Sequence, residues 1–222
     1  MIGFFDYTVL LTYLSLLSAG CGILVSLNGD GHPYWGIAFL LFSGLCDAFD
    51  GKVARTKKDR SEMEQKFGIQ IDSLSDLVAF GVLPMCIGMA MVRRSEALAA
   101  YTWVRYVLAG ITLLYMLAAM IRLAYFNVAE EERQKREKGI ARKVYLGLPV
   151  TSAALIFPTV LLFQFILKSL DITPIYFGVA LLTGFLFLSK IRIGKPGLRG
   201  ILIMVGLGAA EFLIITLLQI FN

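Results

Sequence analysis

Long apolar runs separated by short polar segments dominate the pattern of this sequence. Each run approaches the roughly 20 residues that an α-helix needs to cross the hydrocarbon core of a membrane. The runs predict seven spans, at residues 8–27, 34–56, 70–92, 101–127, 147–168, 174–191 and 198–220. The sequence therefore predicts an all-α fold, a polytopic membrane helical bundle in which residues 1–222 form a single integral membrane domain.

The composition supports a membrane protein. Hydrophobic residues make up 58% of the 222 positions and charged residues 17%, whereas a soluble domain is about half apolar and a quarter charged. The net charge is +5, but basic residues of membrane proteins gather on cytoplasmic loops, so we expect no nucleic-acid partner. The three cysteines lie in apolar runs, and an odd number there argues against a disulfide framework.

The distribution of basic residues predicts the orientation in the membrane. Residues 52–66 and 130–143 hold six Lys or Arg each, and residues 190–199 hold four. The opposite side has only Arg93, Arg94, Arg105 and Lys168. By the positive-inside rule the three basic segments face the cytoplasm. The sequence thus predicts a multi-pass protein of the cell membrane, with its N-terminus inside and its C-terminus outside.

Four acidic residues lie inside the second and third predicted spans, where ionisable side chains are costly and usually functional. Asp47 and Asp50 are three residues apart, and Asp72 and Asp76 are four apart, so each pair shares one helix face. A single loop joins the two spans, which allows the acidic faces to meet. Four carboxylates in a confined space cannot all stay ionised without cations. Hard divalent ions with oxygen ligands, namely Mg²⁺, Mn²⁺ or Ca²⁺, are the natural partners.

Small residues and an arginine accompany these acids. Gly51, Ala54 and Gly68 lie about one helical turn or less from an acid. Each removes side-chain bulk, as if a flat ligand lay against the backbone. Arg55 offers a planar donor fork suited to phosphate. Together with metal ions these residues indicate a nucleotide diphosphate. The alternative, acids that pair with bases at a helix end, explains neither the glycines nor the spacing.

These residues resemble the signature of a known family. Residues 47–55 read DAFDGKVAR and residues 68–76 read GIQIDSLSD. They are similar to the pattern of the CDP-alcohol phosphotransferases, DxxDGxxAR, a spacer and GxxxDxxxD. The spacer has twelve residues here, longer than is usual in that pattern, and the extra residues fall in a polar loop where insertions are tolerated. The resemblance implies a six-helix catalytic core with a seventh span added, a homodimer and an active site facing the cytoplasm.

Further stretches are similar to the phosphatidylserine synthases of bacteria and archaea. They are residues 67–68, 72–84, 122–127, 147–149 and 188–192. This similarity implies transfer of a phosphatidyl group from CDP-diacylglycerol to the hydroxyl of L-serine, giving phosphatidylserine and CMP in a membrane of other lipids. Ala79, Tyr125 and Thr151 depart from that pattern and leave inositol phosphate, glycerol phosphate or another small alcohol open as the acceptor. A divalent-cation transporter is a remote alternative that leaves Gly51 and Arg55 unexplained.

The resemblance also implies roles for individual residues. Two divalent ions, Mg²⁺ or Mn²⁺, would be held over the diphosphate by Asp47, Asp50, Asp72 and Asp76. Asp76 would in addition take the proton from the serine hydroxyl. Gly51, Ala54 and Gly68 would give the cytidine room, and Arg55 would contact the phosphates. Arg122 and Asn127 either contact the lipid phosphate or the serine carboxylate, or are interfacial anchors. Glu211, deep in the last span, lies in an oligomer interface or faces a cavity.

Overall fold

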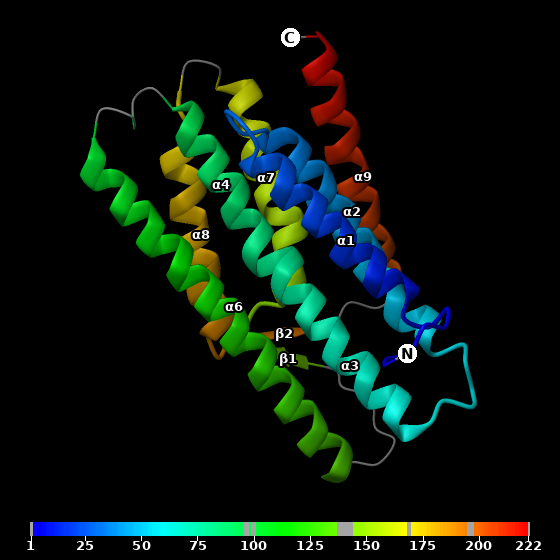
Figure 1. Cartoon of the computed structure of the whole chain (residues 1–222). Helices are drawn as coiled ribbons and strands as arrows, with labels where there is room; N and C mark the ends of the chain where they lie inside the picture. The colour runs from blue at the N-terminus through cyan, green and yellow to red at the C-terminus, as the bar shows by residue number, and fades with distance from the viewer. Residues whose placement is uncertain are drawn as a thin grey trace.

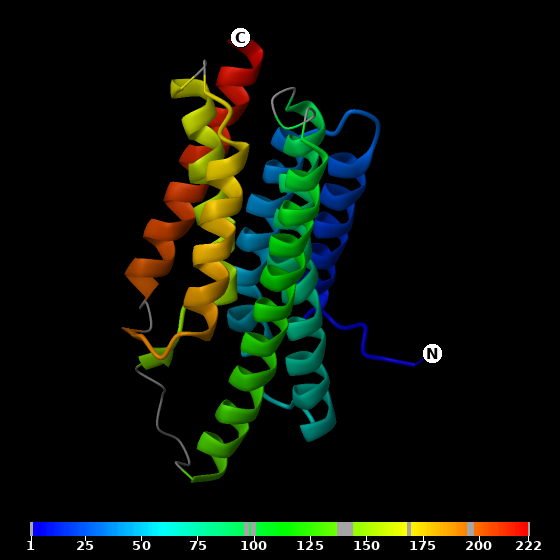
Figure 2. The same ribbon diagram turned by 90° about the vertical axis from the view of Figure 1, so that its left-hand side faces the viewer.

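The computed structural model describes residues 2–95, 98, 101–136, 144–167, 170–194 and 198–221. The chain forms a bundle of α-helices, and the two described ends lie at opposite ends of it (Figure 1). The helices are α1 (Leu10–Leu27), α2 (Pro33–Ala54), α3 (Glu62–Asp76), α4 (Leu83–Arg94), α6 (Thr102–Arg136), α7 (Ala153–Ile166), α8 (Thr173–Leu188) and α9 (Leu198–Phe221). Figure 2 shows α7, α8 and α9 on one side of the bundle and the earlier helices on the other. The predicted all-α fold is confirmed.

Each predicted span corresponds to a helix or to helices that continue into one another. Within the described ranges, three helical segments are long and apolar enough to cross a membrane, at Leu10–Leu27, Glu62–Arg94 and Thr102–Arg133. Three shorter apolar helices accompany them, at Val150–Phe165, Thr173–Leu188 and Leu202–Leu218. These helices support a multi-pass membrane protein.

Two helices extend beyond the spans predicted from hydropathy. The third begins at Glu62 rather than at residue 70, because Ser61 and Glu64 form a capping box in which each side chain accepts the other residue's backbone N–H. The fourth continues past residue 127 to Arg136. There, ion pairs such as Lys135 with Glu131 (2.8 Å), four residues apart, support a helix whose surface is polar.

A π-helical segment, η1 (Leu77–Val82), joins α3 to α4 without a break. Pro84 explains the change in winding, because proline has no N–H and its ring clashes with the carbonyl four residues earlier, that of Phe80. The Tyr115 hydroxyl of α6 donates to the Phe80 carbonyl instead (2.8 Å). Short π-helical segments occur frequently at functional sites, and this one starts directly after Asp76.

Two short strands, β1 (Val144–Leu146) and β2 (Arg192–Gly194), pair antiparallel. Neither strand is predicted from the sequence, because three residues are too few to show an alternating pattern. Gly147 follows β1 with φ of +75°, and a Cβ there would lie 2.7 Å from the Phe187 carbonyl oxygen. The pair therefore joins the chain before α7 to the chain after α8.

Some of the basic residues predicted to face the cytoplasm, those at 137–143 and 195–197, lie outside the described residues.

Small residues and buried hydroxyls let the helices that carry the acids approach closely. An ideal Cβ at Gly44 of α2 would lie 2.6 Å from the Ala154 Cβ of α7. Ser15 of α1 and Ser43 of α2 each donate to the other's carbonyl oxygen, at 3.3 and 3.0 Å. Small residues and hydroxyl bonds of this kind are typical of helix packing in membranes. They fix α1 and α7 on either side of α2.

Candidate active site

The four predicted acids come from two neighbouring helices. Asp47 and Asp50 lie on α2, and Asp72 and Asp76 lie on α3. Asp50 and Asp76 are buried, with 9% and 8% of their surface exposed, and the other two are half-buried. Across the helices Asp47 lies next to Asp76, and Asp50 next to Asp72. The structure therefore brings together the two acidic faces that the spacing predicts.

The acidic cluster fits a divalent cation. Asp47, Asp50 and Asp72 each place one carboxylate oxygen within 4.8 Å of the others. In the part of the chain that the structure describes, the Asp72 Oδ1 atom is buried and has no hydrogen-bond partner. A buried carboxylate without compensation is costly, and oxygen ligands gathered in this way suit hard divalent ions. The cluster thus has the donor set and the unmet charge of a divalent-metal site.

Helix α1 supports the cluster, a contribution that the spacing of the acids does not predict. The Thr12 hydroxyl donates to Asp50 Oδ2 (3.3 Å), and the Ser75 hydroxyl donates to the Thr12 carbonyl oxygen (3.3 Å). Thr12 therefore links the α2 acids to the helix that carries Asp76. The signal in the sequence is a set of hydroxyl residues three apart in an otherwise apolar span, namely Thr12, Ser15 and Ser18, which are all buried.

An arginine side chain lies over each of the two glycines of the signature. An ideal Cβ at Gly51 would lie 3.4 Å from Arg55 Nη1, and one at Gly68 would lie 2.7 Å from Arg60 Nη2. Ala54 is the last residue of α2 and Arg55 is exposed. Arg60 does not stand out in the sequence, because it is one of six basic residues in the same segment. Among the described residues, the buried Arg60 Nε has no hydrogen-bond partner.

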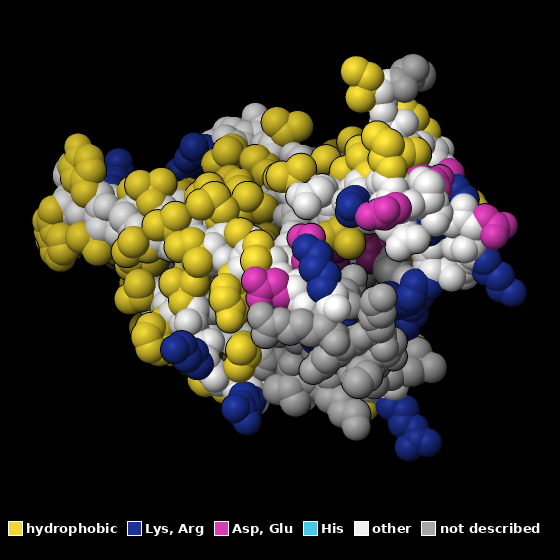
Figure 3. Space-filling view, turned by 90° about the horizontal axis from the view of Figure 1, so that it is seen from below, with side chains coloured by type: hydrophobic (Ala, Val, Ile, Leu, Met, Phe, Trp, Pro, Cys, Tyr) yellow, Lys and Arg dark blue, Asp and Glu magenta, His cyan; other side chains and the backbone are white. Residues whose placement is uncertain are grey.

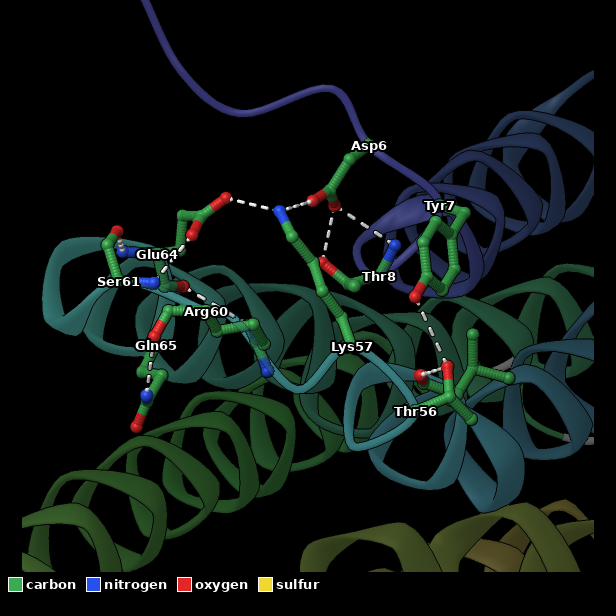
Figure 4. A network of polar contacts seen from close by, with 10 residues as sticks. Asp6, Tyr7, Thr8, Thr56, Lys57, Arg60, Ser61, Glu64 and Gln65 are labelled. Atoms are coloured by element: carbon green, nitrogen blue, oxygen red, sulfur yellow. Dashed lines mark hydrogen bonds and ion pairs between the residues drawn. The ribbon is translucent and has the colours of Figure 1, made fainter.

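Ion pairs hold the long spacer between Arg55 and Gly68 in place (Figure 4). Lys57 Nζ lies 2.7 Å from Asp6 Oδ2 in the N-terminal segment and 2.6 Å from Glu64 Oε1 at the start of α3. The hydrogen bond from Lys57 lowers the pKa of Asp6 to about 2, and the same bond raises the pKa of Lys57 to about 12. The inserted residues therefore form an ordered connection beside the acids.

Arg122 and Asn127, the two site residues predicted on the fourth span, differ in their surroundings. Only Arg122 lines a cavity next to the acids. Arg122 is buried, its Nε donates to the Leu148 carbonyl oxygen (3.1 Å), and it lines a cavity together with Asp47 and Asp76. Asn127 instead donates through Nδ2 to the Ser73 hydroxyl (2.7 Å). Asn127 thus joins α6 to the helix of the acids and is not among the residues that line the cavity.

The cavity has a volume of about 950 Å³ and continues from the acids between α2, α7 and α9. This volume lies near the upper end of the range for sites of small organic ligands, roughly 300–1,000 Å³. Figure 3 views the molecule from the end where α3 and the strands lie, and shows acidic side chains in and around a hollow with Lys and Arg side chains nearby. An acidic, metal-suited group at one end of a largely apolar cavity is the arrangement that an amphipathic phosphate-containing substrate requires.

The sequence matches a known family over most of its length. A family model described as CDP-alcohol phosphatidyltransferase matches residues 7–189, and the chain belongs to this family. The predicted family is therefore confirmed. The matched region contains the four acids and ends before α9, which begins at Leu198.

Several curated relatives share about a third of the aligned residues. The CDP-diacylglycerol–serine O-phosphatidyltransferase of Helicobacter pylori (strain J99) is 32% identical over 152 residues, which cover 67% of this chain and 55% of that protein. The protein of the same name from Saccharomyces cerevisiae is 33% identical over 133 residues, 59% of this chain and 43% of that protein. The archaetidylserine synthase of Methanothermobacter thermautotrophicus is 34% identical over 142 residues, 64% and 52%. The chain spans about half the length of these relatives.

Proposed function

We propose that this protein transfers a phosphatidyl group from CDP-diacylglycerol to the hydroxyl of L-serine, giving phosphatidylserine and CMP. The observation that carries the proposal is the acidic cluster of Asp47, Asp50 and Asp72 at one end of a cavity with mostly apolar walls. A nucleotide lipid has a diphosphate for the acids' metal ions and acyl chains for the apolar walls. The names of the relatives support serine as the acceptor.

In this proposal the acids hold two divalent ions, Mg²⁺ or Mn²⁺. The ligands are Asp47, Asp50, Asp72 and Asp76, from α2 and α3. When bound, two such ions supply positive charge that steadies the attacking and leaving oxygens of an in-line displacement. The buried, unpartnered Asp72 Oδ1 supports this assignment, because it is an oxygen without a protein donor among the described residues.

Asp76 is the proposed general base. Its carboxylate accepts the proton of the serine hydroxyl, and the serine oxygen forms a bond to the lipid-side phosphorus. The bond from that phosphorus to the CMP oxygen breaks, and CMP leaves with the electron pair. Asp76 lines the cavity beside Asp47 and is buried, so it faces the space where this exchange takes place.

The remaining signature residues bind the donor. Gly51, Ala54 and Gly68 leave the backbone open for the cytidine, and Arg55 contacts the phosphates. The guanidinium groups over Gly51 and Gly68 sit on flexible side chains, which move aside or turn toward the diphosphate when the nucleotide enters.

Arg122 completes the proposed substrate-binding set, whereas Asn127, predicted with it, is proposed as a positioning residue. Arg122 lines the cavity with two of the acids, where a guanidinium suits the lipid phosphate or the serine carboxylate. Asn127 acts through its hydrogen bond to Ser73, the neighbour of Asp72, and so positions the acid helix.

The proposal places the whole reaction at the cytoplasmic side of the cell membrane. Residues 1–222 would form a single integral membrane catalytic domain and a homodimer, as the family resemblance implies. The described part of the basic segment between α2 and α3 lies at the same end of the bundle as the acids (Figure 1). Under the positive-inside rule that end faces the cytoplasm.

The test is CMP release by the purified chain with CDP-diacylglycerol and one acceptor at a time. We expect release with L-serine, its loss in excess chelator and its return with Mg²⁺ or Mn²⁺. Release with inositol phosphate or glycerol phosphate, and not with serine, would replace the acceptor and keep the chemistry. Full activity in chelator would contradict the metal assignment, and metal flux into liposomes without any nucleotide would favour a transporter.

A further inference from the structure

Helix α9 lies outside the region that matches the family model, which ends at residue 189. It nevertheless packs against α2 and α7 and forms part of the same cavity as Asp47 and Asp76. Its lining residues are Met204, Val205, Gly208, Ala209 and Phe212. Because these positions recur about every four residues, they lie along one face of the helix. The added helix therefore supplies one wall of the cavity that begins at the acids.

The two faces of α9 differ in what surrounds them. An ideal Cβ at Gly208 would lie 3.4 Å from the Leu41 Cδ2 atom of α2 and 3.5 Å from the Leu155 Cδ2 atom of α7. At Gly206, two residues earlier, an ideal Cβ meets nothing within 4 Å in the described structure, and the residue is exposed. Gly208 thus faces the cavity, while Gly206 faces away from it.

A polar contact holds α9 against α7. The Thr159 hydroxyl of α7 is hydrogen-bonded to the Glu211 carboxyl group of α9. An acid in an apolar span is costly unless it has a partner, so this contact favours one position of α9 along α7. The second carboxylate oxygen of Glu211, Oε2, is buried and has no hydrogen-bond partner among the described residues.

We propose that α9 is the acyl-chain selectivity element of this protein, and that Gly208 sets how much of one acyl chain of the lipid donor enters the cavity. The inference rests on the proposed function. A donor whose reacting phosphorus lies at Asp47 and Asp76 must place its nearest apolar part in the volume that continues from them. That volume is walled by apolar side chains of α2, α6, α7 and α9, and the missing side chain of Gly208 leaves it open between Leu41 and Leu155.

The experiment compares two glycine-to-leucine variants of the full chain. CMP release is measured with L-serine and with CDP-diacylglycerols that carry either octanoyl or palmitoyl chains. Gly208→Leu fills the cavity, and we expect its kcat/KM for the palmitoyl donor, relative to the octanoyl donor, to fall by about tenfold, as if roughly two methylene groups lost their room. Gly206→Leu makes the same chemical change on the other face of α9 and should leave the ratio as in the unaltered protein.

A variant in the opposite direction keeps the test decisive if Gly208→Leu does not fold. Met204→Ala enlarges the cavity from the same helix face and should raise the ratio in favour of the palmitoyl donor. Ratios that stay unchanged in Gly208→Leu and Met204→Ala, or that change equally in Gly206→Leu, would overturn the role of α9. Absence of CMP release by the unaltered protein from either donor would instead count against the proposed function.

Discussion

Single residues around the acids come from more of the chain than the signature itself. Thr12 of α1 donates to Asp50, Asn127 of α6 donates to Ser73 beside Asp72, and the Arg55 guanidinium lies over Gly51. The acids are therefore held by polar contacts from α1 and α6 as well as by their own helices.

Gly51→Ala should give a folded protein with weaker affinity for CDP-diacylglycerol. The added Cβ meets only the Arg55 guanidinium in the described structure, at 3.4 Å or more. Ala favours a helix by about 1 kcal/mol over Gly, so thermal stability in detergent should not fall. Gly20→Ala in α1, where a Cβ meets nothing within 4 Å in the described structure, is the matched control and should bind normally. Unchanged affinity in Gly51→Ala would remove this glycine from the nucleotide site.

Asp76→Asn should abolish turnover and keep much of the donor affinity, because the other three acids remain for metal. Asp47→Asn should weaken donor binding as well, since Asp47 belongs to the group of three oxygens within 4.8 Å. Turnover and donor affinity are measured separately for both variants. Near-normal turnover of Asp76→Asn would show that another group takes the proton.

At the scale of elements, the continuous helix from Glu62 to Arg94 combines a polar start, the acids and a π-helical segment. The capping box at Ser61 explains where it begins, and Pro84 explains why its winding changes after Asp76. The hydroxyls of two buried tyrosines complete the hydrogen bonding there, Tyr115 to the Phe80 carbonyl and Tyr176 to the Pro84 carbonyl. Contacts from α6 and α8 thus support the segment where the winding changes after Asp76.

Tyr115→Phe should destabilise the protein by about 1–3 kcal/mol. The change leaves the buried Phe80 carbonyl without its hydroxyl donor, and Pro84, four residues later, has no N–H to replace it. The measurement is thermal or denaturant unfolding in detergent. Tyr176→Phe is the control: the Pro84 carbonyl lies within α4, where the helix itself supplies an N–H four residues later, so its loss should be smaller. Equal losses would mean that ring packing, and not the carbonyl at η1, requires Tyr115.

At the scale of the whole molecule, the acids lie toward the end of the bundle where α2 meets α3, and the described chain ends lie at opposite ends (Figure 1). A chain that crosses a membrane an odd number of times has its two ends on opposite sides. The loop that carries Lys58 lies near the acids, and the turn that carries Asp30 lies at the far end of α1 and α2. These two exposed positions report which way the bundle faces.

In a background without the native cysteines, Asp30→Cys should react with a membrane-impermeant maleimide added to intact cells. Lys58→Cys should react only after the membrane is opened. The reason is the positive-inside rule, which places the basic segment around Lys58 in the cytoplasm. The reverse labelling pattern would place the active site outside.

The sequence by itself determined the apolar spans, the all-α class and the acidic signature, because each is carried by local spacing. Hydropathy alone misplaced helix ends where polar capping or ion pairs continue a helix, as at Ser61 and at Lys135. It also carried no sign of the strands β1 and β2, whose three-residue lengths show no period. The spacing of the four acids along the chain was enough to identify them, whereas it did not identify the residues that contact them.

Only the tertiary structure decided what surrounds those acids. Thr12 is far from the acids in sequence and Arg60 is hidden among similar residues, and their contacts depend on how α1 and the spacer pack. The same holds for α9, whose mostly apolar sequence does not indicate which side faces the cavity and whose cavity-facing side is defined by α2 and α7. Spacing along one helix is a local property, but which side of it meets a neighbour is set by the packing of the whole bundle.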